Sequence, residues 1–350
     1  MASQASYTSP CAIRGSYRTD DMVKFAVEAA PWQIVVKPLD GRPFHNEKDY
    51  LVTPNIILYR ERFKSAIKVC GLTPENSFTF SLPLSRGNQL QYWNDEEIAN
   101  RFPVSMPDAA DAIFDDGQRH LMVIINLQFL KETFTEETYD NLVKISRSRW
   151  MPFAQERLCS LATRLVSILD ETASYPAILS SNTAIETLEL ELAETLSHIV
   201  SSQNVSRYRP GMPQSRLGLR KSLALLLDEK TSHRSISELC DEATISQRSL
   251  EYAFRNTFGL TPLAFQRLRR LYRANLALRN TDNLQASVSE IALQNGFYEL
   301  GRFAQYYQQV FGELPSSTLR SQDYLRESYS SPLLRKGRRV ESDFRQLLLS

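Results

Sequence analysis

The C-terminal third of the chain contains two runs of residues that can form hydrogen bonds with the edges of DNA bases. Arginine can donate two bonds to guanine, glutamine can pair with adenine, and glutamate can accept a bond from cytosine. For any single residue, an ordinary solvated helix face is the alternative interpretation. The outward candidates are Gln247, Arg248, Glu251, Tyr252 and Arg255 in the first run, and Glu299, Arg302, Gln305, Tyr306 and Gln309 in the second.

Both runs lie inside one sequence pattern that occurs twice. Equivalent residues are at first 52 and then 53 positions apart, because the second copy has one extra residue in its turn. A repeat in register indicates two copies of one structural unit. The pairs are Ser237 and Ser289, Cys240 and Ala292, Ile245 and Phe297, Leu250 and Phe303, Phe254 and Tyr307, Phe258 and Phe311, Gly259 and Gly312, and Pro262 and Pro315.

Each copy predicts a helix, a short turn and a second helix. A small residue, Cys240 or Ala292, lies midway along the first helix, where the second helix can cross closely. Gly296 ends one of these first helices because glycine accepts a positive φ, and Thr244 is less favourable at the equivalent place. Ser246 is a good N-cap for the helix that follows Thr244. This is the layout of a helix-turn-helix unit, whose second helix lies in the major groove.

A long helix from Thr261 and Pro262 to about Leu278 is predicted to join the two units. It carries four arginines that we expect to hold DNA phosphates, namely Arg267, Arg269, Arg270 and Arg273. The charge distribution favours the same partner. Residues 1–214 contain 21 Lys and Arg against 26 Asp and Glu, and residues 215–350 contain 20 against 14. A part with net charge −5 therefore precedes a part with net charge +6, which indicates a polyanionic partner for the second part.

Residues 215–320 resemble the C-terminal DNA-binding domain of the AraC/XylS family of bacterial transcription regulators. The segments that carry the resemblance are Ser246 to Leu250, Phe258 to Pro262, Gly296 and Phe297, and then Phe303, Tyr307, Phe311, Gly312 and Pro315. The resemblance implies seven helices and recognition of two successive major-groove segments on one face of the DNA. It also implies that Arg248, Glu251 and Tyr252 read bases in the first unit, and Leu300, Gly301, Arg302 and Gln305 in the second.

Three positions depart from the family pattern. Leu300 stands where a polar residue or proline is usual, Arg302 where an aromatic residue is frequent, and Leu314 where threonine commonly precedes the proline. These departures affect the base-by-base specificity and not the fold. The segments 296–304 and 315–319 look more like the branch of the family that includes regulators of ethanolamine utilisation, but no effector is transferred on that basis.

The N-terminal part predicts strands followed by helices. Strand candidates are 32–36, 55–63, 77–82 and 121–125, separated by prolines, as in a small antiparallel sandwich or barrel. Helical periodicity follows at 135–145, 152–169 and 183–199. The expected fold class is therefore α+β, with a β-rich N-terminal domain that is similar in outline to cupin-like sensor domains, a helical segment of the dimerisation type, and an all-α domain of two helix-turn-helix units.

Two features of the N-terminal part leave alternatives open. The apolar stripe Ile185, Leu188, Leu192 and Leu196 is either a dimer seam or the core face of a surface helix. Six residues are weak candidates for a ligand pocket, and the alternative is that they are ordinary core and surface residues of a barrel. They are Trp32, Tyr59, Arg60, Phe78, Phe80 and Trp93.

The expected boundaries follow from these patterns. Residues 1–30 are a loose N-terminal segment, and residues 31–200 form the sensor or dimerisation domain, which is β-rich at 31–130 and helical at 131–200. Residues 201–214 are a polar linker rich in Pro and Gly. Residues 215–320 are the DNA-binding domain, and residues 321–350 are a basic tail.

Several classes of protein are not expected. No apolar run is long enough for a membrane span, no signal peptide is visible, and four widely separated cysteines favour a reduced, cytoplasmic protein. His45, His120, His198 and His233 are too dispersed for a metal site, and no G-x-S-x-G motif is present. We therefore expect no enzyme, no cofactor, no metal and no membrane contact.

Two functions remain in play. The first is a DNA-binding transcription regulator, an activator by family expectation, whose N-terminal domain senses a small molecule, dimerises or does both. The second is a regulator whose N-terminal domain is a ligand-independent dimerisation or protein-interaction module. The expected partners are double-stranded DNA, RNA polymerase, a second copy of the chain and a small-molecule effector.

Overall fold

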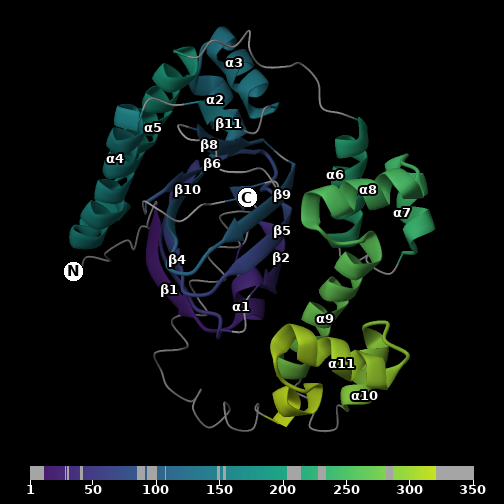
Figure 1. Ribbon diagram of the computed structural model, residues 1–350. Helices are drawn as coiled ribbons and strands as arrows, with labels where there is room; N and C mark the ends of the chain where they lie inside the picture. The colour runs from purple at the N-terminus through teal and green to yellow at the C-terminus, as the bar shows by residue number, and fades with distance from the viewer. Residues whose placement is uncertain are drawn as a thin grey trace, which may run out of the picture.

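The chain folds into a β-rich N-terminal part and an all-helical C-terminal part (Figure 1), so the α+β prediction is confirmed. The structure is a computed structural model, and in its described part no helix is both long enough and apolar enough to cross a membrane. It describes residues 12–27, 29, 31–39, 42–84, 91–92, 101–106, 108–147, 150–152, 155–202, 214–227, 234–280 and 287–320.

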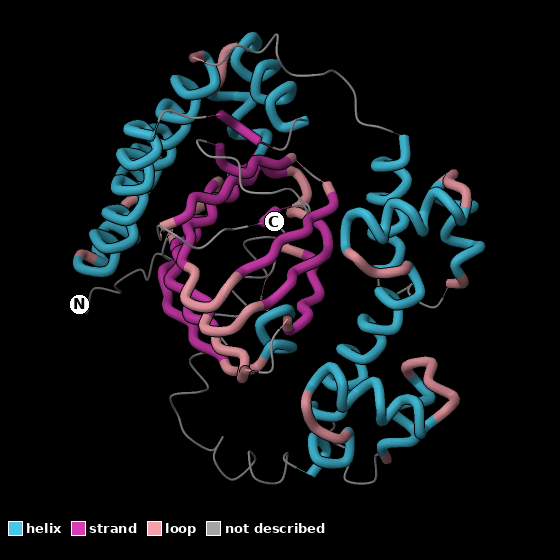
Figure 2. The backbone as a smooth tube through the Cα atoms, in the orientation of Figure 1, coloured by secondary structure: helices cyan, strands magenta, loops and turns pink. Residues whose placement is uncertain are grey.

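Two antiparallel sheets form the N-terminal part (Figure 2), as the alternation of short apolar runs predicts. The larger sheet has the order β1 (Ile13–Thr19), β3 (Asn46–Val52), β4 (Ile56–Phe63), β10 (Arg119–Asn126), β6 (Ser77–Pro83), β8 (Arg101–Ser105) and β11 (Trp150–Pro152). The smaller sheet has the order β2 (Gln33–Pro38), β5 (Ile67–Leu72), β9 (Ala109–Phe114) and β7 (Gln91–Tyr92). The four predicted strands correspond to β2, β4, β6 and β10.

The prediction of a loose segment at 1–30 is wrong for residues 13–27. Strand β1 pairs with β3 from Ile13 opposite Val52 to Thr19 opposite Asn46, and helix α1 (Met22–Val27) follows it. The Asp21 side chain caps α1 by accepting hydrogen bonds from the N–H groups of Val23 and Lys24. Strand β1 is an edge strand whose residues are mostly half-buried or exposed, so it lacks the apolar pattern that marks a strand in a sequence.

Helices of the N-terminal part cover the larger sheet. They are α2 (Leu127–Thr133), α3 (Glu136–Arg147), α4 (Gln155–Ser174) and α5 (Asn182–Ser201), with a short 3₁₀ turn η1 (Pro176–Ser180) between the last two. Their apolar side chains share one core with those of β6 and β10. Ile185, Leu192 and Leu196 are buried in this core and Leu188 packs against it, which favours the core-face interpretation of the stripe.

The described residues of the C-terminal part form six helices with defined bounds and further helical residues at 315–320. The six are α6 (Gln214–Leu227), α7 (Ile236–Ala243), α8 (Gln247–Phe258), α9 (Pro262–Asn280), α10 (Val288–Gln294) and α11 (Leu300–Phe311). With residues 315–320, they give the seven helical segments that the family resemblance implies. Most of the predicted linker, residues 203–213, and the basic tail lie outside the described residues.

Candidate nucleic-acid interface

The same capping box opens both helix-turn-helix units. Before α7, the Ser235 hydroxyl accepts a bond from the Glu238 N–H at 3.3 Å, and the Glu238 carboxylate accepts one from the Ser235 N–H at 2.7 Å. Before α10, Ser287 and Glu290 form the same pair of bonds, at 3.1 and 3.0 Å. Each box satisfies backbone N–H groups that a helix start leaves unpaired. The repeat in the sequence is therefore a repeat of local structure.

The turns between the paired helices also correspond. Thr244 ends α7 in the left-handed conformation with φ of 55°, and Gly296 follows α10 with φ of 77°. The Ser246 hydroxyl then accepts a bond from the Ser249 N–H at 3.1 Å, so the predicted N-cap of α8 is confirmed. Gly259 and Gly312 end α8 and α11 with φ of 64° and 74°. All four positions need a positive φ, and Thr244 meets that need at a cost in free energy.

The interiors of the two units differ in chemistry. In the first, Phe254 makes edge-on contacts with Phe258 and Phe265, at 5.3 and 5.7 Å between ring centres. In the second, the phenol at the equivalent position, Tyr307, accepts a bond from Asn275 at 2.6 Å and donates one to Thr318 at 2.8 Å. Burial raises the pKa of Tyr307 to about 12. Buried hydrogen bonds therefore add to the apolar contacts that hold α11, whereas an apolar phenylalanine ring stands at the equivalent position of α8.

The predicted reading face of α8 is open to solvent. Gln247, Arg248, Tyr252 and Arg255 are exposed, and Glu251 is half-buried. The Gln247 amide donates to the Glu251 carboxylate at 3.2 Å. Tyr252 keeps 67% of its surface exposed although it is a large aromatic residue. A polar face with an exposed aromatic ring near the start of the second helix is suited to base edges in the major groove.

The second reading face is less polar. Leu300, Gly301, Arg302, Gln305 and Gln309 are exposed on α11, and Tyr306 is half-buried. The Arg302 guanidinium pairs with the Glu299 carboxylate at 3.0 Å, and both side chains are exposed. Arg302 can leave this pair at little cost because exposed ion pairs stabilise by at most about 1 kcal/mol.

Tyr298 was not among the predicted site residues. It lies just before α11 and is 82% exposed. The sequence signal that could have found it is the extra residue in the second turn. Because of this insertion, Tyr298 has no clear equivalent in the first unit.

The four arginines of α9 are all half-buried, and three of them make contacts inside the domain. The Arg267 guanidinium lies 4.1 Å from the centre of the Tyr306 ring. Arg269 donates to the Leu227 carbonyl at 2.5 Å, at the end of α6. Arg270 lies against Gly296, and burial lowers the pKa of its guanidinium. These contacts tie α9 to α6, α10 and α11, and the phosphate role of Arg267, Arg269, Arg270 and Arg273 stays a prediction.

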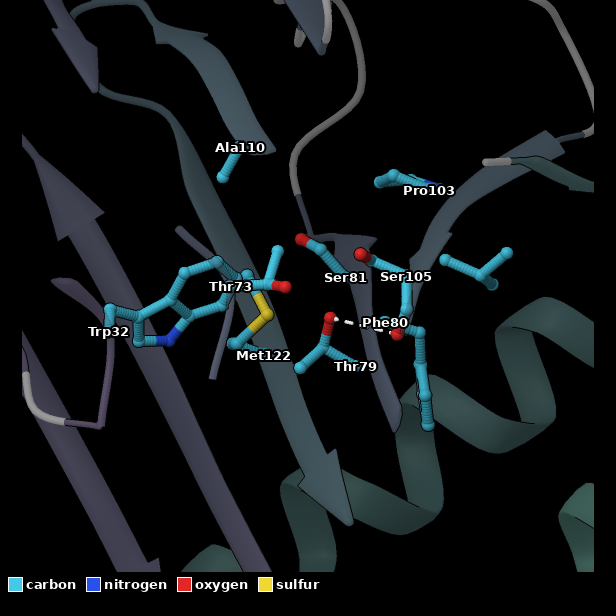
Figure 3. A pocket seen from close by; sticks show the side chains of 10 residues that line it. Trp32, Thr73, Thr79, Phe80, Ser81, Pro103, Ser105, Ala110 and Met122 are labelled. Carbon is cyan, nitrogen blue, oxygen red and sulfur yellow. Dashed lines mark hydrogen bonds between the residues drawn. The ribbon is translucent and has the colours of Figure 1, made fainter. Parts of the chain in front are cut away.

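A small hollow lies between the two sheets (Figure 3). It has a cavity volume of about 20 Å³, which is room for about one water molecule. Trp32 and Met122 lie on one side, and the hydroxyls of Thr79, Ser81 and Thr73 are near the middle. Trp32 Nε1 and Ser81 Oγ are buried without a hydrogen-bond partner. Unpaired polar atoms beside a hollow of this size mark a place that one water molecule can occupy.

The weak candidates for a ligand pocket do not all meet at this hollow. Trp32 and Phe80 border it, and Tyr59 packs nearby with Met122. Phe78 is buried in the core beneath the helices, and Arg60 pairs with Asp49 and Asp170 instead. Trp93 lies outside the described residues. Within those residues, no group of three His, Cys, Asp or Glu side chains is placed to hold a metal ion.

Comparison with known proteins locates the same domain. A family model described as "Helix-turn-helix domain" matches residues 239–321. The chain is 35% identical over 129 residues to the XylDLEGF operon transcriptional activator 2 of Pseudomonas putida, which covers 37% of this chain and 78% of that protein. The chain belongs to the AraC/XylS family of transcription regulators. This is a family of DNA-binding regulators and not of enzymes.

Other AraC/XylS proteins match over a smaller share of their length. Activator 3 of the same operon in Pseudomonas putida is 33% identical over 151 residues, which is 43% of each chain. A probable thc operon regulatory protein of Rhodococcus erythropolis is 31% identical over 118 residues, 33% of this chain and 36% of that one. These relatives give no support to the closer resemblance to regulators of ethanolamine utilisation.

Two solved AraC-type structures are also similar. The AraC-like transcriptional activator CuxR aligns over 76% of this chain and 96% of its own, with 13% identity and a TM-score of 0.42. A probable AraC family regulator from Rhodopseudomonas palustris aligns over 32% of this chain and 98% of its own, with 31% identity and a TM-score of 0.27.

Proposed function

We propose that this regulator activates transcription by binding two successive major-groove segments, one with α8 and one with α11. The observation that carries the proposal is the repeated unit, with the same capping box, the same left-handed turn and an exposed polar face on each second helix. Activation is supported by the matched relatives, five of which are named as activators of the XylDLEGF operon. An activator of this kind has RNA polymerase as a partner.

The roles of individual residues follow from their places on the two helices. Arg248 is suited to donate to guanine, and Glu251 and Gln247 to accept from cytosine or pair with adenine. Tyr252 and Arg255 extend the same face of α8. On α11, Arg302, Gln305 and Gln309 are the polar readers, and Leu300 offers an apolar contact for a thymine methyl group. Gly301 lets the backbone approach the DNA closely.

Selection of bound duplexes from random DNA tests this proposal, with the full-length protein as the probe. Two enriched blocks about ten base pairs apart are expected, because two recognition helices on one DNA face read segments one helical turn apart. Enrichment of a single block would mean that only one of the two helix-turn-helix units reads bases. No enrichment at low salt would overturn the assignment of α8 and α11 as readers.

The α9 arginines are proposed to contact DNA phosphates. All four are half-buried, so only part of each side chain is open to the DNA. Replacement of Arg273 by alanine should weaken binding to all sequences alike and flatten the salt dependence by about one unit. An unchanged salt slope would show that this arginine serves only the packing of α9.

We also propose that the N-terminal domain binds a small-molecule effector in the hollow between the sheets. The unpaired Trp32 Nε1 and Ser81 Oγ support this, and the small volume means that a ligand must displace side chains such as Met122. Fractions of a metabolite extract should raise the melting temperature of the wild type and not of Ala110→Leu, which fills the hollow. The absence of any shift, together with unchanged DNA binding, would favour the ligand-independent module.

A homodimer is the proposed assembly. The groove between α4, η1 and α5 has a volume of about 450 Å³. Apolar side chains such as Ile168 and Ile178 line it beside the Arg164–Glu191 ion pair, so it offers a mixed surface to a second copy. Light scattering of the full-length protein tests this, and a monomer mass at micromolar concentration would contradict it.

A further inference from the structure

A buried ion pair lies where the smaller sheet meets the first helix-turn-helix unit. Lys68 Nζ in β5 is 3.1 Å from Asp111 Oδ1 in β9, and the two residues are only 8% and 1% exposed. The Cys70 thiol lies 3.6 Å from the same oxygen. Helix α6 packs against both strands, and the apolar residues around the pair belong to one cluster that continues into α6, α8 and α9. The pair is therefore part of the contact between the sensor domain and the DNA-binding domain.

The Lys68 ammonium lies beside the end of the first recognition helix. Gly259 is the C-cap of α8, and a Cβ atom placed on Gly259 would be 3.8 Å from Lys68 Nζ. The carbonyl groups at the C-terminus of a helix carry a partial negative charge, and a cation there is favourable. Because Lys68 is buried although Gly259 is exposed, water screens this attraction less than it would between two surface groups.

The second unit has no such contact at its equivalent position. Gly312 ends α11 in the same left-handed conformation, but no described atom lies within 4 Å of a Cβ placed on it. Local structure at the two caps is the same, with Gly259 N–H bonded to Arg255 and Gly312 N–H bonded to Gln308, both at 2.9 Å. The difference comes from the sensor domain, which reaches only the first unit at this point.

Two further contacts hold the connecting helix α9 against the sensor domain. The Tyr272 hydroxyl is buried and donates to the Val36 carbonyl in β2 at 2.5 Å. Arg279 pairs with Asp21, whose carboxylate also caps α1. These contacts hold α9 against the N-terminal domain, so the contact of Lys68 with the end of α8 is made on a fixed base.

We propose that Lys68 is a positioning residue for DNA reading, through which the sensor domain sets the orientation of α8. The residues expected to read bases lie at the opposite end of the helix, at Gln247 and Arg248. A helix of 12 residues is about 18 Å long, so a tilt of about 5° at its C-terminus moves its N-terminus by about 1.5 Å. Hydrogen bonds to base edges do not survive a displacement of that size. This inference rests on the proposed reading role of α8.

The test removes the charge without leaving a buried carboxylate unpaired. The double variant Lys68→Met with Asp111→Asn neutralises both partners, because loss of one alone leaves an uncompensated charge that destabilises the fold. Lys68→Arg keeps a cation at the same place. Lys64→Met is the matched control, since Lys64 also forms a carboxylate pair, with Glu47 at 2.7 Å, but on the exposed side of the sandwich.

DNA affinity is measured on three duplexes. The first contains both selected blocks, the second has the α8 block scrambled, and the third has the α11 block scrambled. We expect the double variant to bind the two duplexes that keep the α8 block with about tenfold lower affinity than the wild type. On the duplex with a scrambled α8 block, its affinity should equal that of the wild type. Lys68→Arg and Lys64→Met should bind all three as the wild type does. Thermal unfolding of each full-length variant accompanies the affinities.

Two outcomes overturn the inference. An equal loss on all three duplexes means that the ion pair serves only stability, and wild-type affinity of the double variant on all three means that it does not position α8. Failure of the proposed function is distinct, because then the wild type itself would not distinguish the three duplexes.

Discussion

The first helix-turn-helix unit shares its core with the smaller sheet, whereas the buried core of the second unit meets that shared core only through the half-buried Val310 and Phe311 among the described residues. Leu250, Phe254 and Phe258 belong to a cluster that continues through α6 into β2, β5 and β9. Phe303 and Tyr307 belong to a separate cluster with α10 and the second half of α9. Two copies of one local structure are thus set in different surroundings, and the smaller sheet of the N-terminal domain packs directly against the first of them.

This difference also separates the contribution of local sequence to each unit from the contribution of tertiary contacts. Capping residues and turn residues are the same in both units and act within a few positions of the chain. The surroundings depend on contacts between residues more than a hundred positions apart, such as Tyr272 with Val36. The predictions below test whether the first unit and the sandwich behave as one body, from the largest expected effect to the smallest.

Removal of a core aromatic ring should distinguish the two units most strongly. Phe254→Ala should destabilise by about 3–5 kcal/mol, because it leaves a cavity in the shared core. Hydrogen exchange should then accelerate in α6–α8 and also in β5. Phe303→Ala, with an equally buried ring, should accelerate exchange in α10 and α11 only. Exchange in β5 at the wild-type rate in Phe254→Ala would contradict the shared core.

Acid should weaken the shared core before the separate one. Burial lowers the pKa of His120 to about 4, and its ring stacks against Phe114 at 4.8 Å and lies 6.1 Å from Phe63, both in the shared cluster. The unfolded chain takes up this proton near pH 6.5 and the folded chain only near pH 4. Stability is therefore complete above about pH 6.5 and falls by about 3 kcal/mol as the pH drops to 4.

Denaturant unfolding across this pH range measures the effect, and exchange in α10 and α11 should stay unchanged. His120→Gln should abolish the slope, whereas His198→Gln, at an exposed site on α5, should keep it. Glu47 does not produce this slope. Lys64 and His45 lower its pKa to about 2, so its contribution to the free energy of unfolding changes only at pH values below about 4.5. The same slope in His120→Gln would contradict this account.

Loss of the buried hydrogen bonds of the second unit should lower the free energy of unfolding by less than loss of a core aromatic ring does. Tyr307→Phe removes the hydroxyl between Asn275 and Thr318 and leaves both without that partner. We expect a loss of about 1–3 kcal/mol, measured by urea unfolding and by exchange in α11. Tyr306→Phe is the control, since its ring stays available to Arg267. Equal stability of Tyr307→Phe and the wild type would show that the network does not hold α11.

The smallest effect is expected at the turn of the first unit. Thr244→Gly should stabilise by about 1 kcal/mol, because glycine adopts the observed φ of 55° without strain. Gly296→Thr should destabilise by at least as much, since a Cβ there would meet Arg270 at 3.2 Å. Thermal midpoints check both, and a lower midpoint for Thr244→Gly would mean that the threonine side chain has a role beyond the turn.

Features set by nearby residues could be predicted from the sequence. Ser246 as a cap, Thr244 and Gly296 as turn residues, and the inward positions Leu250 and Phe303 all follow from spacing and residue type. The edge strand at Ile13–Thr19 could not be predicted, because an edge strand shows little apolar alternation. The internal contacts of the α9 arginines were missed for a different reason, namely that a basic residue has the same sequence pattern whether it meets a phosphate or a carbonyl.

The role of Lys68 is invisible in the sequence. It is one lysine in a strand that was not predicted, 43 positions from Asp111 and 191 from Gly259. Only the packing of β5 against α6 brings these residues together. Contacts between domains of this kind depend on tertiary structure and leave no short-range signal.

The central claim is that α8 and α11 read separate blocks of one DNA site. Selection from random DNA with full-length Arg248→Ala, Arg302→Ala and the control Arg147→Ala, an exposed arginine on α3, tests it most directly. The account predicts that Arg248→Ala loses preference at one or two positions of one block and Arg302→Ala at positions of the other, each by about 1–3 kcal/mol, with the control unchanged. Unchanged motifs in both variants, or a change in the same block, would contradict it.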